Sequence, residues 1–441
     1  MSEKAQDWGR ELARKIKTKK AQVAVIGLGY VGLPLAHAFA QRGFEVIGID
    51  LDINKIHAIN HAKSYIPDVP TSELALVVKS GKLKAVNNFE CLMHVDAVIV
   101  CVPTPLNRVK DPDMSYILSA TDAIAKHLHP GMLVSLESTT YPGTTEEVIL
   151  PELEKSGLKA GKDFFLCFSP ERVDPGNSRF KTQNIPKVVG GVTERCGELA
   201  GALYGNITTE VVRVSSSRTA EMAKLLENTF RIVNIGLINE LAMAADKLQV
   251  NIWEAIEAAK TKPFGFMPFY PGPGIGGHCI GVDPLYLSWK ARVHGQDLHF
   301  IELARRMNIG MPQYVVSQAV YALNRHLGKA ISRSRVLVLG VSYKKDVSDI
   351  RESPALDVIE KLHGLGAKLA YHDPYVPKID HEGVKLSSIP LTAANVKKHD
   401  LVIITTDHTG IDYGMVVEQS RLIYDTRNTL RKFKNEKIVR L

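Results

Sequence analysis

Cysteine is scarce in this chain of 441 residues, and its five copies are odd in number and contain no Cys-x-x-Cys pair. That pattern argues against a disulfide framework and against a structural zinc site, so we expect no bound metal. Four of the cysteines lie in apolar or helical contexts and are expected to be small buried residues: Cys91, Cys101, Cys167 and Cys196. Cys279, by contrast, stands among glycines.

Long apolar runs and one-sided charge are also lacking. No apolar run approaches the roughly 20 residues that cross a bilayer, and residues 1–20 lack the apolar stretch of a secretory signal. The net charge is +8, but its densest cluster is confined to residues 14–20, and elsewhere basic residues are mixed with acidic ones. We therefore expect a cytoplasmic protein that binds neither membranes nor nucleic acid.

The first 215 residues alternate short apolar runs with helical stretches. The runs are nearly continuous, as expected of strands that are covered on both faces. We predict strands at 22–26, 45–49, 97–102, 133–136 and 164–168. Because helical stretches separate them, a parallel, doubly wound sheet is the natural architecture.

Helical spacing dominates the middle of the chain, from residue 216 to about 249 and again from 299 to 327, where Gly310 and Pro312 interrupt it. Between these stretches, residues 263–281 are rich in proline, glycine and aromatics, which predicts an irregular, functional loop.

Alternation of strands and helices returns in the last part of the chain. Strands are predicted at 335–339, 368–371, 401–405 and 422–424, and a helix at 353–365. The predicted fold class is therefore α/β in three domains: doubly wound at 1–215, all-helical at 216–328 and α/β again at 329–441.

A glycine motif, Gly27-Leu28-Gly29-Tyr30-Val31-Gly32, follows the first predicted strand and opens a helix. Gly27 permits the tight turn, Gly29 lets the backbone approach a pyrophosphate, and Gly32 lets the helix pack on the strand. A turn that merely packs would also use glycine, but the strand–turn–helix context favours a Rossmann-type dinucleotide site.

Two residues beyond the second predicted strand bear on the choice of cofactor. Asp50 ends that strand, where a carboxylate accepts hydrogen bonds from ribose hydroxyls and repels a 2′-phosphate, so we predict NAD rather than NADP. Lys55 is either a ribose contact or a solvated lysine at a helix start.

Cys279 lies in the segment Gly276-Gly277-His278-Cys279-Ile280-Gly281-Val282-Asp283. Glycines allow close approach to a nucleophile, and a thiolate needs nearby positive potential or backbone dipoles. These residues alone leave two interpretations, a nucleophile or a small residue in a crowded loop.

Lys224 and Asn228 are four residues apart on the first apolar helical stretch, hence on one face of it. A lysine on a buried face needs a partner such as a developing oxyanion, unless it reaches solvent. Residues 138–145 and 169–176 each follow a predicted strand, at the sheet edge where doubly wound folds bind ligands. Glu171 there is a candidate acid/base or a residue that holds its loop.

Together these motifs resemble the UDP-glucose/GDP-mannose dehydrogenase family, and the resemblance covers nearly all of the chain. The segments that carry it, in the family's order, are 27–32, Val102-Pro103-Thr104-Pro105, 138–145, 169–171, Lys224 with Asn228, 276–283 and 343–354. The resemblance implies a four-electron, NAD-dependent oxidation of a sugar-nucleotide alcohol at C6, for surface polysaccharide precursor synthesis.

Residue roles also follow from the resemblance. Cys279 would trap an aldehyde as a thiohemiacetal and then carry a thioester. Lys224 and Asn228 would stabilise oxyanions, Asp283 and Thr139 would position water, and Glu171 would be the acid/base candidate. Further NAD contacts would be Pro103, Thr104, Thr139 and Arg351. Substrate contacts would be Glu171, Arg172, Val173, Lys224, Asn228, Phe269, Tyr270, Gly272, Gly276 and Lys344, the last from a C-terminal domain that binds UDP.

Departures from the family pattern bear on the sugar. Pro175 stands where the UDP-glucose branch has a second glutamate, and Val282 stands where that branch has lysine. Residues 261–274 are similar to the UDP-N-acetylglucosamine branch, whereas Gly281 is similar to UDP-N-acetylgalactosamine enzymes. We predict UDP-N-acetylglucosamine, with UDP-N-acetylgalactosamine, UDP-N-acetylmannosamine and UDP-glucose as alternatives.

Two other classes of protein stay open. A two-electron hydroxyacid or polyol dehydrogenase also combines an NAD fold with a Lys-x-x-x-Asn helix, but it needs neither Cys279 nor Lys344. A non-catalytic NAD-binding protein would not need Cys279, Lys224 and Asn228. The apolar helical stretch at 222–245 further predicts a homodimer or a higher homo-oligomer.

Overall fold

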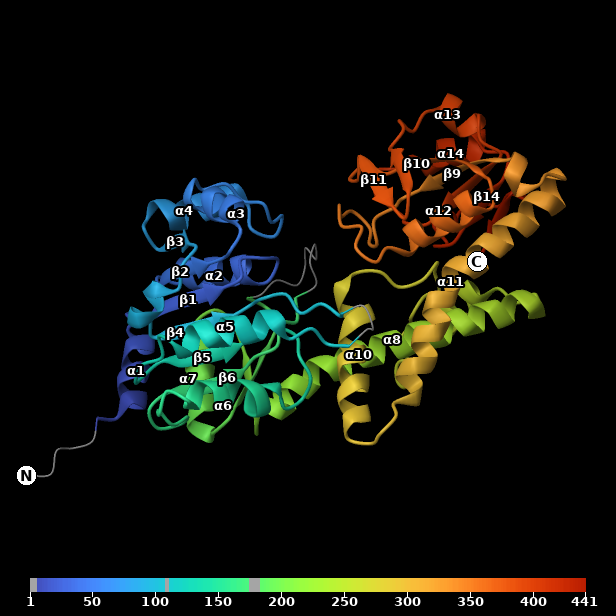
Figure 1. The fold of residues 1–441 in the computed structure, drawn as a ribbon. Coiled ribbons are helices and arrows are strands. Elements are labelled where there is room, and N and C mark those ends of the chain that lie inside the picture. Colours follow the sequence, from blue (N-terminus) through green and yellow to red (C-terminus); the bar gives the residue numbers. More distant parts are fainter. Residues whose placement is uncertain (1–5, 108–110, 174–182) are drawn as a thin grey trace, which may run out of the picture. The chain divides into compact units, whose positions relative to one another are not determined.

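A computed structural model describes residues 6–107, 111–173 and 183–441 (Figure 1). The chain divides into two compact units, the first comprising Met1–Glu227 and Leu285–His294 and the second comprising Asn228–Pro284 and Gly295–Leu441. Two helices, α8 (Ser217–Leu248) and α10 (His278–Val293), therefore contribute residues to both units.

The first unit is built on an eight-stranded sheet of order β3-β2-β1-β4-β5-β6-β7-β8. All neighbouring strands are parallel except β6 and β7, which pair antiparallel. The strands are β1 (Gln22–Ile26), β2 (Glu45–Ile49), β3 (Leu83–Val86), β4 (Ala97–Val100), β5 (Leu133–Leu136), β6 (Phe165–Phe168), β7 (Lys187–Gly191) and β8 (Val211–Val214). Strand order reverses between β1 and β4, which is where doubly wound sheets bind ligands.

Helices cover both faces of this sheet because its strands are apolar on both sides. Val23 and Val25 of β1 pack into one core, and Ala24 and Ile26 pack into the other. The first core is covered by α1 (Trp8–Lys17), α2 (Gly32–Gln41), α3 (Ile53–Asn60), α4 (Thr71–Lys79) and α7 (Glu194–Tyr204). The second is covered by η1 (Glu90–His94), α5 (Ser115–Ala125), η2 (Thr145–Ile149) and α6 (Leu150–Glu154).

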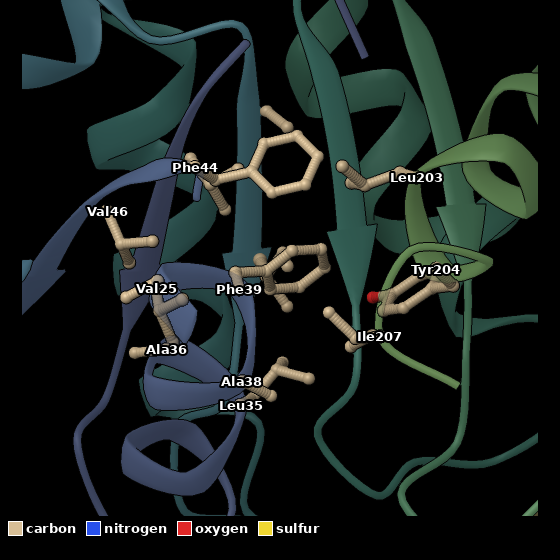
Figure 2. Packing of buried hydrophobic residues seen from close by; sticks show 14 of the residues in the cluster. Val25, Leu35, Ala36, Ala38, Phe39, Phe44, Val46, Leu203, Tyr204 and Ile207 are labelled. Carbon is tan, nitrogen blue, oxygen red and sulfur yellow. The ribbon is translucent and has the colours of Figure 1, made fainter. Parts of the chain in front are cut away.

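Aromatic packing joins α2 to α7 in the first core. The Phe39 ring lies 5.6 Å from that of Phe44 and 6.2 Å from that of Tyr204, measured between centroids. Figure 2 shows the Phe39 side chain between those of Phe44 and Tyr204. This contact ties the glycine-motif helix to the second half of the sheet.

The second unit combines helices with a parallel five-stranded sheet of order β10-β9-β13-β14-β15 and an antiparallel hairpin, β11–β12. Its strands are β9 (Arg335–Leu339), β10 (Lys368–His372), β11 (Lys378–His381), β12 (Val384–Ser387), β13 (Leu401–Ile404), β14 (Ile423–Asp425) and β15 (Ile438–Arg440). Its further helices are α9 (Ile252–Lys260), α11 (His299–Leu327), η3 (Ile331–Arg333), α12 (Pro354–Gly364), α13 (Ala393–Lys397) and α14 (Tyr413–Gln419).

The predicted fold class is confirmed, with a helical middle region between two α/β regions. Two local predictions were wrong. The irregular segment ends at Gly277 rather than at residue 281, because α10 begins at His278. Helix α11 also continues unbroken through Gly310 and Pro312, because buried neighbours such as Met311 pack it into the core of the second unit.

Several short strands were not predicted, namely β3, β7, β8, β11, β12 and β15. Their sequences are interrupted by lysine, arginine or glycine, so they lack the apolar run that marks the others. In the part of the chain that the structure describes, no helix is both long enough and apolar enough to cross a membrane.

Candidate functional site

A pocket of about 290 Å³ opens at the carboxyl ends of β1, β2 and β4, beside the reversal of strand order. Five of the predicted NAD residues line it: Gly27, Gly29, Asp50, Lys55 and Pro103. A Cβ atom at Gly27 would lie 2.5 Å from the Cys101 carbonyl oxygen, so only glycine fits, whereas a Cβ at Gly29 would meet nothing within 4 Å. The backbone at Gly29 is therefore open to a pyrophosphate, and the residues present fit a dinucleotide.

Asp50 is anchored by the backbone of the glycine motif. Its carboxylate accepts hydrogen bonds from Leu28 N at 2.8 Å and Asp52 N at 2.9 Å. Lys55 Nζ lies 3.1 Å from Asp50 Oδ2, so this lysine is paired with the predicted ribose acceptor. The Leu28 side chain is fully buried, and the residue contributes to the site through its backbone alone.

The other predicted NAD residues do not line the pocket. Some are close in sequence to residues that do, and Arg351 belongs to the second unit. Val31 precedes α2 and Gly32 begins it, Tyr30 is exposed, and Thr104 is buried. Arg351 belongs to the second unit, where its guanidinium pairs with Asp349 at 2.6 Å.

Most of the other residues that line the pocket were missed from the sequence, among them Phe89, Tyr116 and Ser119. Tyr116 and Ser119 belong to α5, and with Ala120 they face the pocket at helical spacing. The helical spacing of these residues could have predicted a shared face of α5, but no sequence motif indicated that this face lines the pocket.

Thr139 and Lys224 come together in the first unit, where Lys224 Nζ donates to Thr139 Oγ1. The turn that follows Thr139 is held by Glu221, one helical turn before Lys224 on α8. Glu221 Oε2 accepts from Gly143 N at 2.6 Å, and Oε1 accepts from Thr145 N at 2.9 Å and Thr145 Oγ1 at 2.6 Å. Burial raises the pKa of Glu221 to about 7, although these hydrogen bonds oppose the rise. No motif in the sequence singled out this glutamate.

Glu171 is held on both of its oxygens. Oε1 accepts from Arg172 N at 2.6 Å and Val173 N at 2.8 Å, and Oε2 lies 3.1 Å from Lys187 Nζ. Lys187 is itself buried and contacts Glu137 Oε2 at 2.7 Å. Burial raises the pKa of Glu171, but Lys187 and the backbone N–H groups outweigh it and lower the pKa overall. Glu171 is therefore an ionised acceptor at neutral pH.

The neighbouring Arg172 guanidinium pairs with Glu227 at 2.5 Å and donates to the Pro186 carbonyl at 2.9 Å. Asp174, Pro175 and Gly176 of the same predicted segment lie outside the described residues.

Cys279 is the second residue of α10 and is exposed. A helix N-terminus presents backbone N–H groups and a partial positive charge, both of which favour a thiolate. Of the other cysteines, Cys101, Cys167 and Cys196 are buried as predicted, whereas Cys91 is only partly buried. Burial raises the pKa of the Cys91, Cys101 and Cys167 thiols, which sets them apart from a reactive cysteine.

One turn further along α10, Asp283 is buried and accepts a 2.7 Å hydrogen bond from the Asn228 amide. The two predicted catalytic residues are thus joined within the second unit. Asn228 follows Lys224 by one turn of α8, as the sequence predicted.

The glycines before Cys279 pack against the segment 343–352. A Cβ at Gly276 would lie 2.5 Å from Tyr343 Cβ and 2.8 Å from the Glu352 carbonyl oxygen. Gly277 has φ +82 and donates from its N–H to the Arg351 carbonyl at 3.0 Å. Gly276 requires glycine because the Tyr343 side chain and the Glu352 backbone lie so close, and Gly277 requires it because of its positive φ and the nearby Tyr343 ring.

The other predicted substrate residues of the second unit are also placed. Phe269 packs on Phe230 with ring centroids 5.6 Å apart, and the Tyr270 hydroxyl donates to Glu257 at 2.6 Å. Gly272 N donates to the Asn239 side chain at 3.0 Å. The Lys344 carbonyl accepts from Ser342 Oγ at 2.9 Å.

Three sequence profiles of one family match successive parts of the chain. They are the NAD binding domain of the UDP-glucose/GDP-mannose dehydrogenase family at residues 21–208, its central domain at 218–309 and its UDP binding domain at 337–432. The chain belongs to the UDP-glucose/GDP-mannose dehydrogenase family.

Relatives within this dehydrogenase family differ in the sugar that their names give. A UDP-N-acetyl-D-glucosamine 6-dehydrogenase from Pseudomonas aeruginosa is 39% identical over 89% of this chain and 91% of its own. The solved structure of a UDP-D-ManNAc dehydrogenase from Pyrococcus horikoshii is 35% identical, covers 95% of this chain and 98% of its own, and has a TM-score of 0.86. An NDP-N-acetyl-D-galactosaminuronic acid dehydrogenase from Methanosarcina mazei Go1 is 30% identical over 99% of this chain and 98% of its own, with a TM-score of 0.80.

The resemblance drawn from the motifs is thereby confirmed. As a member of this dehydrogenase family, the chain is an NAD-dependent UDP-sugar dehydrogenase, an oxidoreductase with an N-terminal NAD-binding domain and a C-terminal UDP-binding domain.

Proposed function

We propose that this dehydrogenase oxidises the C6 alcohol of a UDP-N-acetylhexosamine, with UDP-N-acetylglucosamine preferred, to the uronic acid in two successive steps. The exposed thiol of Cys279 in the first turn of α10 carries this proposal, because a covalent thiol intermediate is what a four-electron oxidation needs and a two-electron one does not. The product would serve as a surface polysaccharide precursor.

Two oxidations and one hydrolysis would convert the alcohol to the acid. NAD held at the glycine turn and Asp50 would supply the hydride acceptor for each oxidation, so two NAD would be consumed for each sugar. The alcohol first loses a hydride and a proton to give an aldehyde, and the Cys279 sulfur adds to its carbonyl carbon as a thiohemiacetal. Loss of a second hydride and a proton gives a thioester. Water then displaces the thiolate, and the carboxylate leaves with C6 bonded to the oxygen of that water.

The supporting residues act on charge and on water. Lys224, and the Asn228 amide held by Asp283, would stabilise the oxygen that becomes negative in each step. Thr139 and Asp283 would position water. Glu171 would act as an ionised hydrogen-bond acceptor rather than as an acid, because Lys187 and two backbone N–H groups stabilise its charge.

The sugar is chosen from the sequence and the relatives together. Val282 in place of lysine argues against UDP-glucose, and an N-acetylglucosamine enzyme is among the relatives, as are N-acetylmannosamine enzymes. UDP-N-acetylmannosamine and UDP-N-acetylgalactosamine therefore remain the alternatives to test against it, with UDP-glucose behind them.

The test is an NADH assay against all four UDP-sugars, with product analysis. We expect UDP-N-acetylglucosamine to give the highest kcat/KM and two NADH for each sugar consumed, with an acid product. A preference for another epimer would change the sugar and leave the reaction intact. One NADH with a carbonyl product would show the two-electron class, and no NADH with any UDP-sugar would show a binding protein.

The proposal extends to assembly and location. It includes a homodimer formed through the exposed apolar side of α8, a cytoplasmic location, and the division into domains at residues 215 and 328. Supporting the dimer, Phe230, Leu237, Leu241 and Leu248 recur at intervals of seven and four on α8, and each is at least 45% exposed in the single chain.

A further inference from the structure

The segment between β9 and α12 in the second unit is backbone under strain. Asp346 has φ 59 and Glu352 has φ 50, values in the left-handed region that non-glycine residues seldom adopt. Such conformations persist only where the surroundings hold them. The segment 342–352 contains Lys344, and it forms the surface on which Gly276 and Gly277 pack.

A fully buried histidine holds this segment. His408 Nδ1 lies 3.0 Å from Asp346 N, and its Nε2 lies 3.0 Å from Asp373 Oδ2 and 3.2 Å from Ser342 Oγ. Both ring nitrogens of His408 are therefore engaged, one with the strained residue itself.

The partners determine the tautomer of His408. A backbone N–H can only donate, so Nδ1 carries a lone pair. Asp373 is ionised: burial raises its pKa, but His408 and backbone N–H groups outweigh burial and lower it. A carboxylate can only accept, so Nε2 carries the proton. The hydrogen-bond partners therefore assign His408 the tautomer with its proton on Nε2 and its lone pair on Nδ1.

The same turn holds the segment at two further points. Thr409 donates from its N–H to Asp346 Oδ1 at 2.8 Å, and Thr406 Oγ1 donates to the Ser342 carbonyl at 2.6 Å. Asp373 in turn accepts from Val341 N at 2.7 Å. The His408 turn and the end of β10 therefore clamp the segment from its start to Asp346.

We propose that His408, as its Nε2–H tautomer, is a positioning residue that clamps the segment 342–352 and through it aligns both Lys344 and the glycines that precede Cys279. The inference rests on the proposed roles of Cys279 and Lys344. The UDP-binding domain then helps to hold Cys279 in place. The geometry of the thiol depends on a histidine that contacts neither substrate nor cofactor.

Two variants that each remove one hydrogen bond separate positioning from simple destabilisation. His408→Asn keeps an acceptor near the Nδ1 position for Asp346 and loses the donor to Asp373. His408→Gln keeps a donor near the Nε2 position and loses the acceptor for Asp346. His399→Gln is the matched control, because His399 is buried in the same domain and its ring Nδ1 lies 2.6 Å from the Asn395 carbonyl of the preceding helix, α13.

Two readouts need no turnover: the Kd for UDP by calorimetry, and the rate of Cys279 alkylation by iodoacetamide, followed by peptide mass. For His408→Gln we expect roughly tenfold weaker UDP binding, the ratio that one lost buried hydrogen bond produces. Alkylation should slow about two- to fivefold as the helix N-terminus loses its alignment with the thiol. His408→Asn should stay near wild type in both, and NADH binding should be unchanged in all variants.

Equal losses in His408→Asn and His408→Gln, or the same losses in His399→Gln, would show that general destabilisation explains the effect and would overturn the proposal. Wild-type values in His408→Gln would overturn it too. Neither readout requires a reaction. If the enzyme oxidised none of the UDP-sugars, the proposed function would be contradicted, but the UDP affinity and the alkylation rate would still test the role of His408.

Discussion

Single side chains in this site are mostly committed to a partner before any substrate binds. Lys224 donates to Thr139, the Asn228 amide donates to Asp283, and Lys187 lies between Glu137 and Glu171. Dipoles that are already oriented stabilise a developing charge without having to reorganise at the moment of reaction. Cys279 is exposed and lies where a helix N-terminus favours its ionised form.

The residue-scale prediction separates the thiol from the oxyanion donor. Cys279→Ala should lose acid formation altogether, whereas Lys224→Ala should keep the thiol and lose about a hundred- to a thousandfold in kcat. Cys279→Ser should still bind UDP-sugar and NAD but stall, because serine is a much weaker nucleophile at neutral pH. Intact mass should detect any acyl adduct, and peptide mass mapping should place it on residue 279 in both Lys224→Ala and Cys279→Ser.

Cys91→Ala is the control, since burial raises the pKa of that partly buried thiol and it lies outside the site. Conversion of UDP-sugar to acid by Cys279→Ala at a near wild-type rate would return Cys279 to the role of a small residue at a crowded turn.

At the scale of elements, α8 organises the first half of the site through one buried carboxylate. Glu221 accepts three hydrogen bonds from the 143–145 turn, and Lys224 contacts Thr139 just before that turn. Glu221 therefore joins the turn to the helix through these hydrogen bonds, and burial raises the pKa of its carboxyl group.

The pH dependence of stability should report this carboxylate. Its folded pKa is about 7 against an ordinary value of 4.5, so between these pH values the folded protein keeps a proton that the unfolded chain has released. The unfolding free energy should therefore fall as the pH rises from 4.5 to 7, by up to about 3 kcal/mol at about 1.4 kcal/mol for each pKa unit, and this contribution should be flat above.

Urea unfolding of the wild type and Glu221→Gln at pH 5 and pH 8 measures it. The glutamine variant should lose this part of the pH dependence. Glu147→Gln is the control: hydrogen bonding from Lys290 lowers the pKa of Glu147, so the variant should not flatten the curve in that range. An unchanged pH dependence in Glu221→Gln would contradict the assignment.

For the whole molecule, two compact units each hold part of the predicted machinery. The NAD pocket, Thr139, Lys224 and Glu171 belong to one, and Cys279, Asn228, Asp283 and Lys344 belong to the other. Helices α8 and α10 contribute residues to both units, and on α8 Lys224 of the first unit and Asn228 of the second are four residues apart in the chain.

Assembly is the prediction at this scale. A pair of substitutions, Leu237→Glu with Leu241→Glu, places charge on the exposed apolar side of α8 and should convert a dimer to a monomer, measured by light scattering after gel filtration. Leu76→Glu on α4 is the control, because Leu76 is 70% exposed outside that surface. A wild-type chain that is monomeric at micromolar concentration would contradict the dimer.

Much of the fold could be predicted because its signals are local. Continuous apolar runs marked β1, β2, β5 and β9 to the residue, and the glycine motif marked the turn into α2. Asp50 was predicted as a ribose contact because it follows the second strand, where a dinucleotide-binding motif has an acidic residue. Each of these signals is contained in a few consecutive residues, where strand period and turn geometry act directly on the chain.

The sequence by itself determined the order of the three regions, α/β, helical and α/β, and the glycine turn of the cofactor site, and it supplied the proposal for the reactive residues, since each of these is written in a short motif. Only the tertiary structure decided that α11 continues through Pro312 and that Glu221, Lys187 and His408 hold the loops on which those motifs stand. The physical reason is distance along the chain. A buried polar side chain is specified by partners dozens of residues away, such as Glu137 for Lys187 and Asp346 for His408, and no local pattern reveals that they meet.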